Sequence, residues 1–268
     1  MYSIERTAEI LKLLEEQGRV DVNQLAAHFE ASRETIRRDL REMEAKGLLK
    51  RTHGGAVLRG GRSADLPEFP VGVREIQNVR EKETICKAAA TFVQNGDSLF
   101  VDNSSTCLYL LPYIPDDLQI TLITNSIKLL LRSAELKRRN VITICLGGFF
   151  HGSNLSTYGD LSRKNAADFY PTRSFLSCAG IQPSGQLTDS SILEVETKRL
   201  MIARSQEVFI LADHTKFGRS GPVLLCDLSE IDCLITDPHA EPAQCAPLEQ
   251  AGVRVVRTPY ERGPALPQ

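Results

Sequence analysis

The spacing of apolar residues predicts two kinds of structure along the chain. In residues 1–58, apolar side chains recur three or four positions apart, as in the pairs Leu11–Leu14 and Ile36–Leu40, which is the spacing of amphipathic helices. From about Arg80 to Val256, short β-branched runs alternate with helical patterns, which is typical of an α/β domain with a mostly parallel sheet. We expect strands at 98–102, 120–125, 141–147, 174–180, 208–213, 233–236 and 253–256, and helices beginning near residues 82, 105, 126, 161, 192 and 242.

Changes in composition divide the chain further. Residues 59–80 are rich in Gly and Pro and show no periodicity, so we expect them to form a linker. Residues 258–268 are rich in Pro as well and are expected to form a flexible tail. The predicted organisation is a small helical domain over 1–58, the linker, an α/β domain over 81–257 and the tail.

The small domain has the pattern of a winged helix-turn-helix. A short helix predicted from Val22 to Phe29 is joined by three residues to another helix, which Ser32 caps and Gly47 ends. Residues 48–58 then predict two short strands around a turn at Gly54 and Gly55. A two-stranded hairpin directly after the last helix is the wing of this motif.

The last helix of this domain carries the candidate chemistry. With Ile36 and Leu40 facing inward, the outward side chains include Arg33, Thr35, Arg37, Arg38 and Arg41. Arginine can bind phosphate oxygens and can read guanine edges, so the helix suits double-stranded DNA. A solvated basic helix face would show the same run of charge.

The wing favours the DNA interpretation. Lys50, Arg51 and His53 lie near its predicted tip, where they suit contact with the DNA backbone. The net charge of the whole chain is only −2, so any binding to nucleic acid depends on this local patch.

In the α/β domain, polar turns follow several predicted strands, where ligands of parallel sheets gather. The first turn runs from Asp102 to Thr106, and its hydroxyls and free N–H groups suit an anion. The other candidate ligand-binding positions are Thr124, Asn125, Gly147, Gly148, Asp189 and Lys216. Each of these turns also has an ordinary explanation as a capping turn or a surface ion pair.

The string E-T-I-R-R-D-L followed by G-L-L-K-R-T-H-G-G-A resembles the N-terminal signature of the DeoR family of bacterial transcriptional regulators. The resemblance covers essentially the whole chain. It implies that the last helix faces operator DNA through Ser32, Arg33, Thr35, Arg37 and Arg38, and that His53, Gly54 and Gly55 form the wing beside Arg51.

The later blocks resemble the effector domain of this family, which is similar in fold to ribose-5-phosphate isomerase. This resemblance implies a phosphorylated sugar or related metabolite as ligand. It assigns the phosphate loop to Asp102, Ser104, Ser105 and Thr106, and the remaining contacts to Thr124, Asn125, Gly147, Gly148 and Lys216.

The chain departs from the family pattern at two positions. Ser104 stands where the family usually has Gly, which narrows the phosphate loop, and Gln182 stands where an Asp is frequent. Aldose–ketose isomerisation needs a positioned base, and Gln182 removes one candidate. Asp189, Glu194 and Asp213 remain as replacements.

We therefore expect a ligand-controlled repressor of sugar or related carbon metabolism genes, without catalytic residues or cofactor. The alternative is a sugar-phosphate isomerase-like enzyme with an appended DNA-binding domain. A metal sensor is disfavoured because the five histidines are isolated from the seven cysteines.

The expected setting is the cytoplasm. No apolar run is long enough to span a bilayer, no secretory signal is evident, and the seven cysteines form no C-x-x-C pair, so we expect reduced thiols. One recognition helix covers a single half-site of DNA, which favours a homodimer or homotetramer assembled through the α/β domain.

Overall fold

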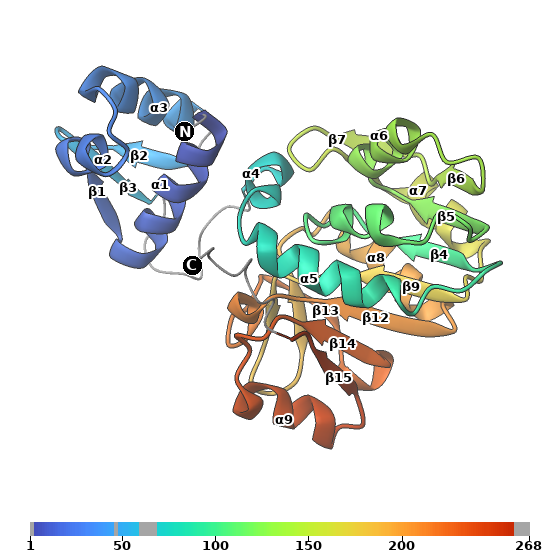
Figure 1. Cartoon of the computed structure of the whole chain (residues 1–268). Coiled ribbons are helices and arrows are strands. Elements are labelled where there is room, and N and C mark those ends of the chain that lie inside the picture. The colour runs from blue at the N-terminus through green and yellow to red at the C-terminus, as the bar shows by residue number, and fades with distance from the viewer. Residues whose placement is uncertain (1–2, 46–47, 59–68, 260–268) are drawn as a thin grey trace, which may run out of the picture. The chain divides into compact units, whose positions relative to one another are not determined.

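The computed structural model describes residues 3–45, 48–58 and 69–259 and divides into two compact units between Gln77 and Asn78 (Figure 1). Residues 59–68 of the predicted linker and 260–268 of the predicted tail lie outside the described residues. Within the predicted linker, Val71–Glu75 form a short helix, α4, rather than irregular structure, and Val71 is buried.

The first unit is a winged helix-turn-helix, as the sequence pattern predicts. Its elements, in chain order, are α1 (Ser3–Gln17), β1 (Arg19–Asp21), α2 (Val22–His28), α3 (Arg33–Ala45), β2 (Leu49–Arg51), β3 (Gly55–Leu58) and α4. Buried apolar side chains of the three longer helices and the strands form one core, which includes Leu11, Leu14, Leu25, Ile36, Leu40, Met43 and Leu49.

Strand β1 has only three residues, so the sequence pattern does not predict it, yet it pairs with the wing. It pairs antiparallel with β3, which also pairs with β2, so the sheet order is β1-β3-β2. Gly55 lies within β3 and not in the hairpin turn, which corrects the predicted Gly54–Gly55 turn. A Cβ atom on Gly55 would lie 1.8 Å from the carbonyl oxygen of Val20, so the close approach of β1 requires glycine there.

The second unit is built on a parallel sheet with the strand order β15-β14-β12-β9-β4-β5-β6. Every pairing in this sheet is parallel. All seven predicted strands are present, with bounds β4 (Ser98–Val101), β5 (Ile120–Thr124), β6 (Val141–Cys145), β9 (Arg173–Leu176), β12 (Glu207–Leu211), β14 (Cys233–Thr236) and β15 (Arg254–Arg257). The order reverses beside β4 and β9, so ligands of this class of sheet are expected at their carboxyl ends.

Two small antiparallel sheets accompany the main sheet and were not predicted. They are the ribbon β7 (Phe149–His151) and β8 (Ser156–Tyr158), and the sheet of β10 (Gly180–Ile181), β11 (Leu187–Asp189) and β13 (Val223–Cys226). Strands of two to four residues are too short for an alternating pattern to stand out.

The helices of the second unit begin within three residues of the predicted positions, with one exception. They are α5 (Val79–Ala90), α6 (Ile127–Leu136), α7 (Asp160–Ala167), α8 (Val195–Arg204) and α9 (Pro242–Gln250). The helix predicted after Ser105 is instead two short 3-10 helices, η1 (Cys107–Tyr109) and η2 (Leu111–Tyr113). Pro112 explains the difference because it has no N–H for an α-helical hydrogen bond.

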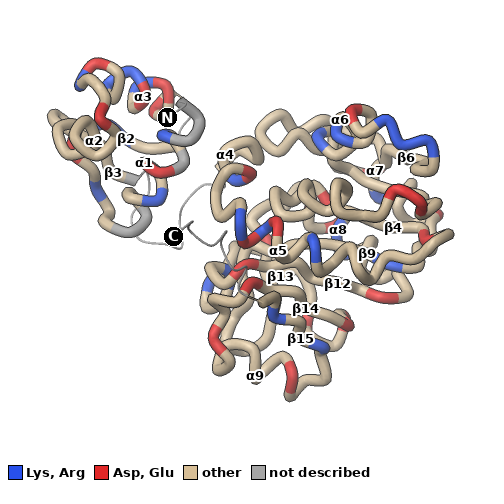
Figure 2. The backbone as a smooth tube through the Cα atoms, viewed as in Figure 1, with Lys and Arg blue, Asp and Glu red and all other residues tan. Residues whose placement is uncertain are grey.

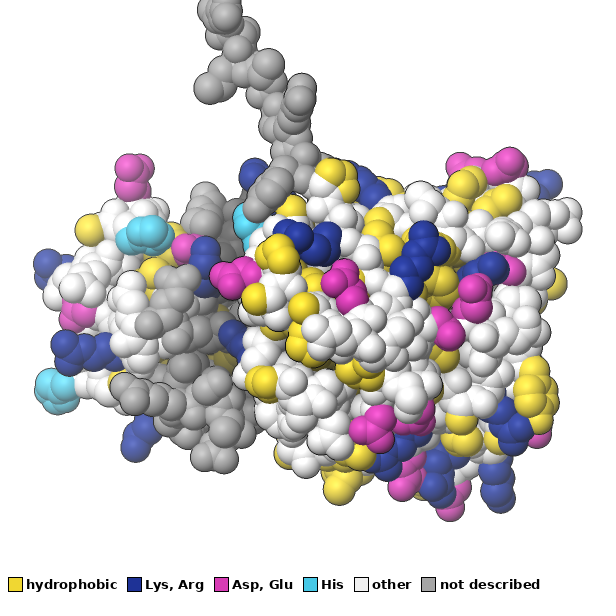
Figure 3. All heavy atoms as spheres, turned by 90° about the horizontal axis from the view of Figure 1, so that it is seen from below, with side chains coloured by type: hydrophobic (Ala, Val, Ile, Leu, Met, Phe, Trp, Pro, Cys, Tyr) yellow, Lys and Arg dark blue, Asp and Glu magenta, His cyan; other side chains and the backbone are white. Residues whose placement is uncertain are grey.

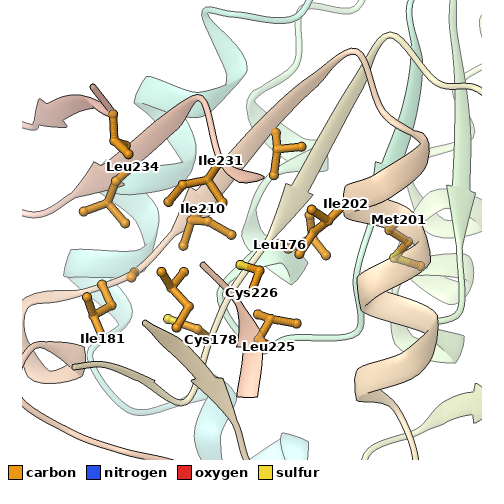
Figure 4. Close-up of a cluster of buried hydrophobic side chains, with 14 of the residues drawn as sticks. Leu176, Cys178, Ile181, Met201, Ile202, Ile210, Leu225, Cys226, Ile231 and Leu234 are labelled. Atoms are coloured by element: carbon orange, nitrogen blue, oxygen red, sulfur yellow. The ribbon is translucent and has the colours of Figure 1, made fainter. Parts of the chain in front are cut away.

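The core of the second unit joins the two sheets that flank α8. Figure 4 shows side chains from β9, β12, β13 and β14 converging with Met201 and Ile202 of α8. The cysteines of this cluster include Cys178 and Cys226, and burial raises the pKa of each of these two thiols to about 12. Thiols held protonated in this way act as small apolar side chains.

Candidate functional site

Helices α2 and α3 each begin with a capping side chain. Asp21 caps α2 by accepting from the backbone N–H groups of Asn23 and Gln24, at 2.7 and 3.2 Å. The Oγ of Ser32 accepts from the backbone N–H of Thr35 at 3.1 Å and lies 2.9 Å from the Thr35 hydroxyl. Ser32 and Thr35, which the sequence places on the DNA surface, therefore bond to each other and set the start of α3.

Arginine side chains occupy the outward face of α3, as predicted. Arg33, Arg37, Arg38 and Arg41 are all exposed. Figure 2 shows that acidic positions alternate with these basic ones along α3. The exposed face of α3 is therefore mixed in charge.

A buried ion pair behind α3 was not found from the sequence. The Nε of Arg6 on α1 donates to a carboxylate oxygen of Asp39 on α3 at 2.7 Å, and both side chains are nearly inaccessible. Asp39 belongs to the string that carries the family resemblance, but its role is set by the crossing of α1 and α3. The pair fixes α3 to α1.

The wing presents its polar tip to solvent. Arg51, His53 and Gly54 are exposed, whereas Gly55 is buried beneath β1. The backbone N–H of Arg51 donates to a carboxylate oxygen of Glu44 at 2.9 Å, which fastens the wing to the end of α3. Of the four predicted wing residues, Gly55 thus allows the close approach of β1, and the other three are exposed to solvent.

In the second unit, a buried lysine joins two of the predicted ligand-binding carboxylates. The ammonium of Lys198 on α8 lies 3.0 Å from Asp102 and 2.6 Å from Asp189, and it donates to the carbonyl oxygen of Ser177 at 3.0 Å. All three charged side chains are buried. Burial alone lowers the pKa of Lys198, but the charges of Asp102 and Asp189 outweigh it and raise that pKa well above the usual value.

Asp102 is therefore a structural anchor of its loop. Its second carboxylate oxygen accepts from the backbone N–H of Ser104 at 2.9 Å, and the oxygen near Lys198 accepts from Ser177 N–H at 3.0 Å. The Ser104 hydroxyl accepts from the N–H of Cys107, the first residue of η1, at 3.2 Å. These contacts occupy Asp102 and Ser104 within the protein.

The same loop leaves donors free. In the described chain, the backbone N–H groups of Ser105 and Thr106 donate to no acceptor, although both residues are buried. The hydroxyl of Thr124, at the end of β5, in contrast already makes hydrogen bonds within the protein. It donates to the Val101 carbonyl at 2.6 Å and accepts from Ser126 N–H at 3.0 Å.

Asn125 supplies an acceptor beside this loop. Its amide nitrogen donates to Asn103 Oδ1 at 3.2 Å and to the Thr157 carbonyl at 3.1 Å, so the amide group cannot turn over. Its Oδ1 atom is buried and has no hydrogen-bond partner among the described residues. A buried acceptor without a donor costs free energy, which marks this atom as a position for a ligand donor.

The remaining predicted ligand residues, Gly147, Gly148 and Lys216, differ in how closely neighbouring atoms surround them. A Cβ on Gly148 would lie 2.4 Å from the Tyr158 carbonyl, so this glycine is required by the contact with β8. At Gly147 a Cβ would meet only the Asn165 side chain, at 3.9 Å, but the φ angle of +68° favours glycine there. Lys216 lies on the 3-10 helix η3 (His214–Lys216) and is half-buried. Burial alone raises the pKa of Asp213, but the charge of Lys216 and the hydrogen bonds from Thr215 outweigh it and hold that pKa below its usual value.

Three carboxylates that could replace the missing base are all engaged. Asp189 is paired with Lys198; its burial alone would raise its pKa, but the Lys198 charge and hydrogen bonds keep that pKa lowered. Glu194 accepts from His151 Nδ1 at 3.1 Å, from Asn154 at 3.0 Å and from the Ser156 hydroxyl. Lowered pKa values at Asp189 and Asp213 make both carboxylates weak bases near neutral pH.

Neither the surface charge of the second unit nor any cluster of metal-ligating side chains in the described residues indicates a further binding site. On the face in Figure 3, basic and acidic side chains are interspersed over the second unit, without a single field of one sign. Within residues 3–45, 48–58 and 69–259, no group of three His, Cys, Asp or Glu side chains is arranged to hold a metal ion. No helix among these residues is long and apolar enough to cross a membrane.

Comparison with protein-family models matches both units. Residues 6–60 match the DeoR-like helix-turn-helix domain, and residues 77–238 match the DeoR C-terminal sensor domain.

Individual relatives cover nearly the whole chain. An uncharacterized HTH-type transcriptional regulator, YulB of Bacillus subtilis, is 32% identical over 98% of this chain and 99% of its own. The glycerol-3-phosphate regulon repressor of Escherichia coli is 30% identical over 88% and 92%. The L-fucose operon activator of Haemophilus influenzae is 35% identical over 85% and 89%.

Among solved structures, ribose-5-phosphate isomerase A of Methanocaldococcus jannaschii matches 53% of this chain and 55% of its own. The TM-score is 0.39 and the sequence identity 12%, a level too low to transfer any property of that enzyme.

Proposed function

The chain belongs to the DeoR family of transcriptional regulators, and we propose that it represses sugar or related carbon metabolism genes under the control of a phosphorylated sugar or related metabolite. Its helix-turn-helix domain binds DNA, and in this proposal the partner is double-stranded operator DNA read by α3 and the wing. The relatives include named repressors and a named activator, so membership of the family does not determine whether the chain represses or activates its target genes.

One observation carries the proposal of a polyhydroxylated anionic effector. The acceptor Asn125 Oδ1 and the free N–H groups of Ser105 and Thr106 lie on the segments that follow the adjacent strands β5 and β4. A sugar phosphate combines hydroxyl groups with an anion. A hydroxyl can donate to Asn125 Oδ1, and the phosphate can accept from the N–H groups of Ser105 and Thr106. Lys216 follows β12 at the same edge of the sheet and supplies a cation.

The buried ion pairs of Lys198 support this site indirectly. They hold the Asp102 and Asp189 side chains in place and so hold the loop that contains Ser105 and Thr106. A rigid loop lowers the entropy cost of binding a small ligand.

Ligand control of DNA binding needs two arrangements of the protein. We infer a homodimer or homotetramer, in which the effector binds one arrangement of the subunits better than the other. Operator DNA places such a protein in the cytoplasm. The enzyme alternative is weakened by the engaged carboxylates and by the naming of the relatives as regulators.

A thermal-shift screen tests the effector. Purified protein is heated with triose, pentose and hexose phosphates, with each parent sugar, and with inorganic phosphate. A true effector at 100 times its Kd should stabilise the fold by about 2.7 kcal/mol, and the parent sugar should not. If no phosphorylated compound shifts the transition, the proposal is wrong. Turnover of the same compounds would instead identify an enzyme.

A further inference from the structure

Helix α3 places an acidic side chain in the middle of its exposed face. Ile36 and Leu40 are buried on one side of the helix. Glu34, Arg38 and Arg41 follow at spacings of four and three residues, so they form a row on the opposite side. Glu34 lies in the first turn, and the N-terminal residues of a recognition helix are those that contact base edges.

The Glu34 carboxylate is paired with two arginines of the same face. It accepts a hydrogen bond from Arg41 and lies 3.9 Å from the Nη1 of Arg37. Arg41 also donates through Nε to the carbonyl oxygen of Arg37 at 3.2 Å, which turns its guanidinium back toward Glu34. Glu34 thus offsets part of the positive charge that α3 offers to phosphates.

Stability does not account for this carboxylate. The side chains of Glu34, Arg37 and Arg41 are 69%, 59% and 52% exposed. Ion pairs this exposed contribute between about 0 and 1 kcal/mol, so DNA can replace them easily. A carboxylate near the phosphates is repelled, and on most DNA sequences it only weakens binding.

The chemistry of the major groove limits what Glu34 can bind. A carboxylate only accepts hydrogen bonds, and the donors in the major groove are the amino groups of cytosine and adenine. The adenine amino group lies beside the N7 acceptor, which repels a carboxylate, whereas the cytosine edge offers its donor without that neighbour.

We propose that Glu34 determines operator specificity by accepting a hydrogen bond from the N4 amino group of a cytosine, while it weakens binding to DNA that lacks a cytosine at that position. This inference rests on the proposed role of α3 as the operator-reading helix. Arg37 and Arg41 are then released from Glu34 and can bind DNA themselves.

The first test identifies the preferred DNA of the full chain and of variants. Wild-type protein, Glu34→Gln, Glu34→Ala and Glu42→Gln are each used to select duplexes from a random-sequence library, which are then sequenced. Glu42 is a matched control because it is also exposed on α3 but lies two turns further along. The wild type and Glu42→Gln should enrich the same cytosine, Glu34→Ala should lose that preference, and Glu34→Gln should favour adenine, with which glutamine pairs well.

The second test measures affinity directly. Replacing the selected cytosine should weaken wild-type binding about tenfold and should leave Glu34→Ala binding nearly unchanged. On an alternating A·T duplex, which contains no cytosine, Glu34→Gln should bind about threefold more tightly than the wild type at low salt. Glu42→Gln should show a smaller gain.

The outcomes separate the two proposals. If the wild type enriches no sequence, operator binding by α3 is wrong and the role of Glu34 falls with it. If the wild type enriches a site that Glu34→Ala and Glu34→Gln enrich unchanged, only the inference on Glu34 is overturned. Equal gains for Glu34→Gln and Glu42→Gln on the A·T duplex would also overturn it, because net charge alone would then explain the effect.

Discussion

The ammonium of Lys198 lies 3.0 Å from the Asp102 carboxylate, although 96 positions separate the two residues in the chain. Lys198 comes from α8 and Asp102 from the end of β4, so the contact exists only because α8 packs over the carboxyl ends of the central strands. The same ammonium binds Asp189 at 2.6 Å. One buried cation therefore holds two carboxylates at the edge of the sheet where we propose that the effector binds.

Replacing this lysine should destabilise the second unit strongly. Lys198→Met leaves Asp102 and Asp189 buried without their cation, and breaking a buried pair in this way costs about 3–5 kcal/mol. Urea unfolding measures the loss. Lys164→Met, at an exposed position on α7, is the control and should change stability by less than about 0.5 kcal/mol.

The loss should depend on pH with a definite sign. In the wild type the pKa of Asp189 is lowered, so its contribution is present above the unfolded value near ~4 and is lost as the pH falls through the folded value. In Lys198→Met, burial is opposed only by the backbone hydrogen bonds from Ser190 and Ser191, so the pKa of Asp189 rises above its wild-type value and protonation relieves the variant. The difference in unfolding free energy should be smaller at pH 5 than at pH 8, and a difference that does not vary with pH would refute this explanation.

Gly55 should be essential to the wing, whereas its neighbour should not. Gly55→Ala places a Cβ 1.8 Å from the Val20 carbonyl, so β1 and β3 must separate, at a cost of about 1–3 kcal/mol. At Gly54 a Cβ would meet only Asp21 Oδ2, at 3.5 Å, which is ordinary contact. Thermal unfolding and gel-shift titration should show that Gly55→Ala loses stability and DNA affinity while Gly54→Ala keeps its stability. Equal stability of the two variants would contradict the role of β1.

Operator binding should depend on the arginines of α3. Replacing Arg33, Arg37 and Arg38 with Ala should cost about 1–3 kcal/mol for each base-reading side chain and should lower the salt dependence for each phosphate contact. Titrations at several salt concentrations separate the two effects. The same change at Lys137 and Arg139, exposed in the second unit, should leave affinity nearly unchanged. Unaltered binding by the triple variant would exclude α3 as the DNA-reading helix.

Lys216 should matter for the effector response and not for free DNA binding. Lys216→Ala removes the cation that we assign to the ligand, while the units of the chain keep their cores. We expect normal operator affinity without ligand and a lost or much weaker response to the stabilising sugar phosphate. An undiminished response in a gel-shift titration would mean that Lys216 serves only its interaction with Asp213.

Self-association should reside in the second unit. Light scattering of the full chain and of a fragment over 78–268 should show the same dimer or tetramer. A monomeric fragment from an oligomeric full chain would place the interface in the first unit. A full chain that stays monomeric at micromolar concentration would refute the assembly altogether.

The sequence by itself determined the two domain types and the seven strands of the parallel sheet. Strands buried on both faces form continuous apolar runs, and the helices around Leu11 and Leu40 keep a strict period, so local pattern suffices for them. The arginines of α3 and the polar turns after β4 and β5 also follow from position alone. The short strands β1, β7 and β10 do not, because two or three residues carry no period.

Only the tertiary structure decided what each polar residue does. Asp102 and Ser104 were predicted as ligand contacts, but Asp102 bonds to Ser104, Ser177 and Lys198 and Ser104 bonds to Cys107. Gly55 and Gly148 are required by neighbouring backbone. Lys198 pairs with two buried carboxylates of the predicted ligand region, yet nothing in its helical sequence pattern marks it. Its partners come from β4 and β11, and no local pattern records which distant carboxylates a lysine will meet once the chain has folded.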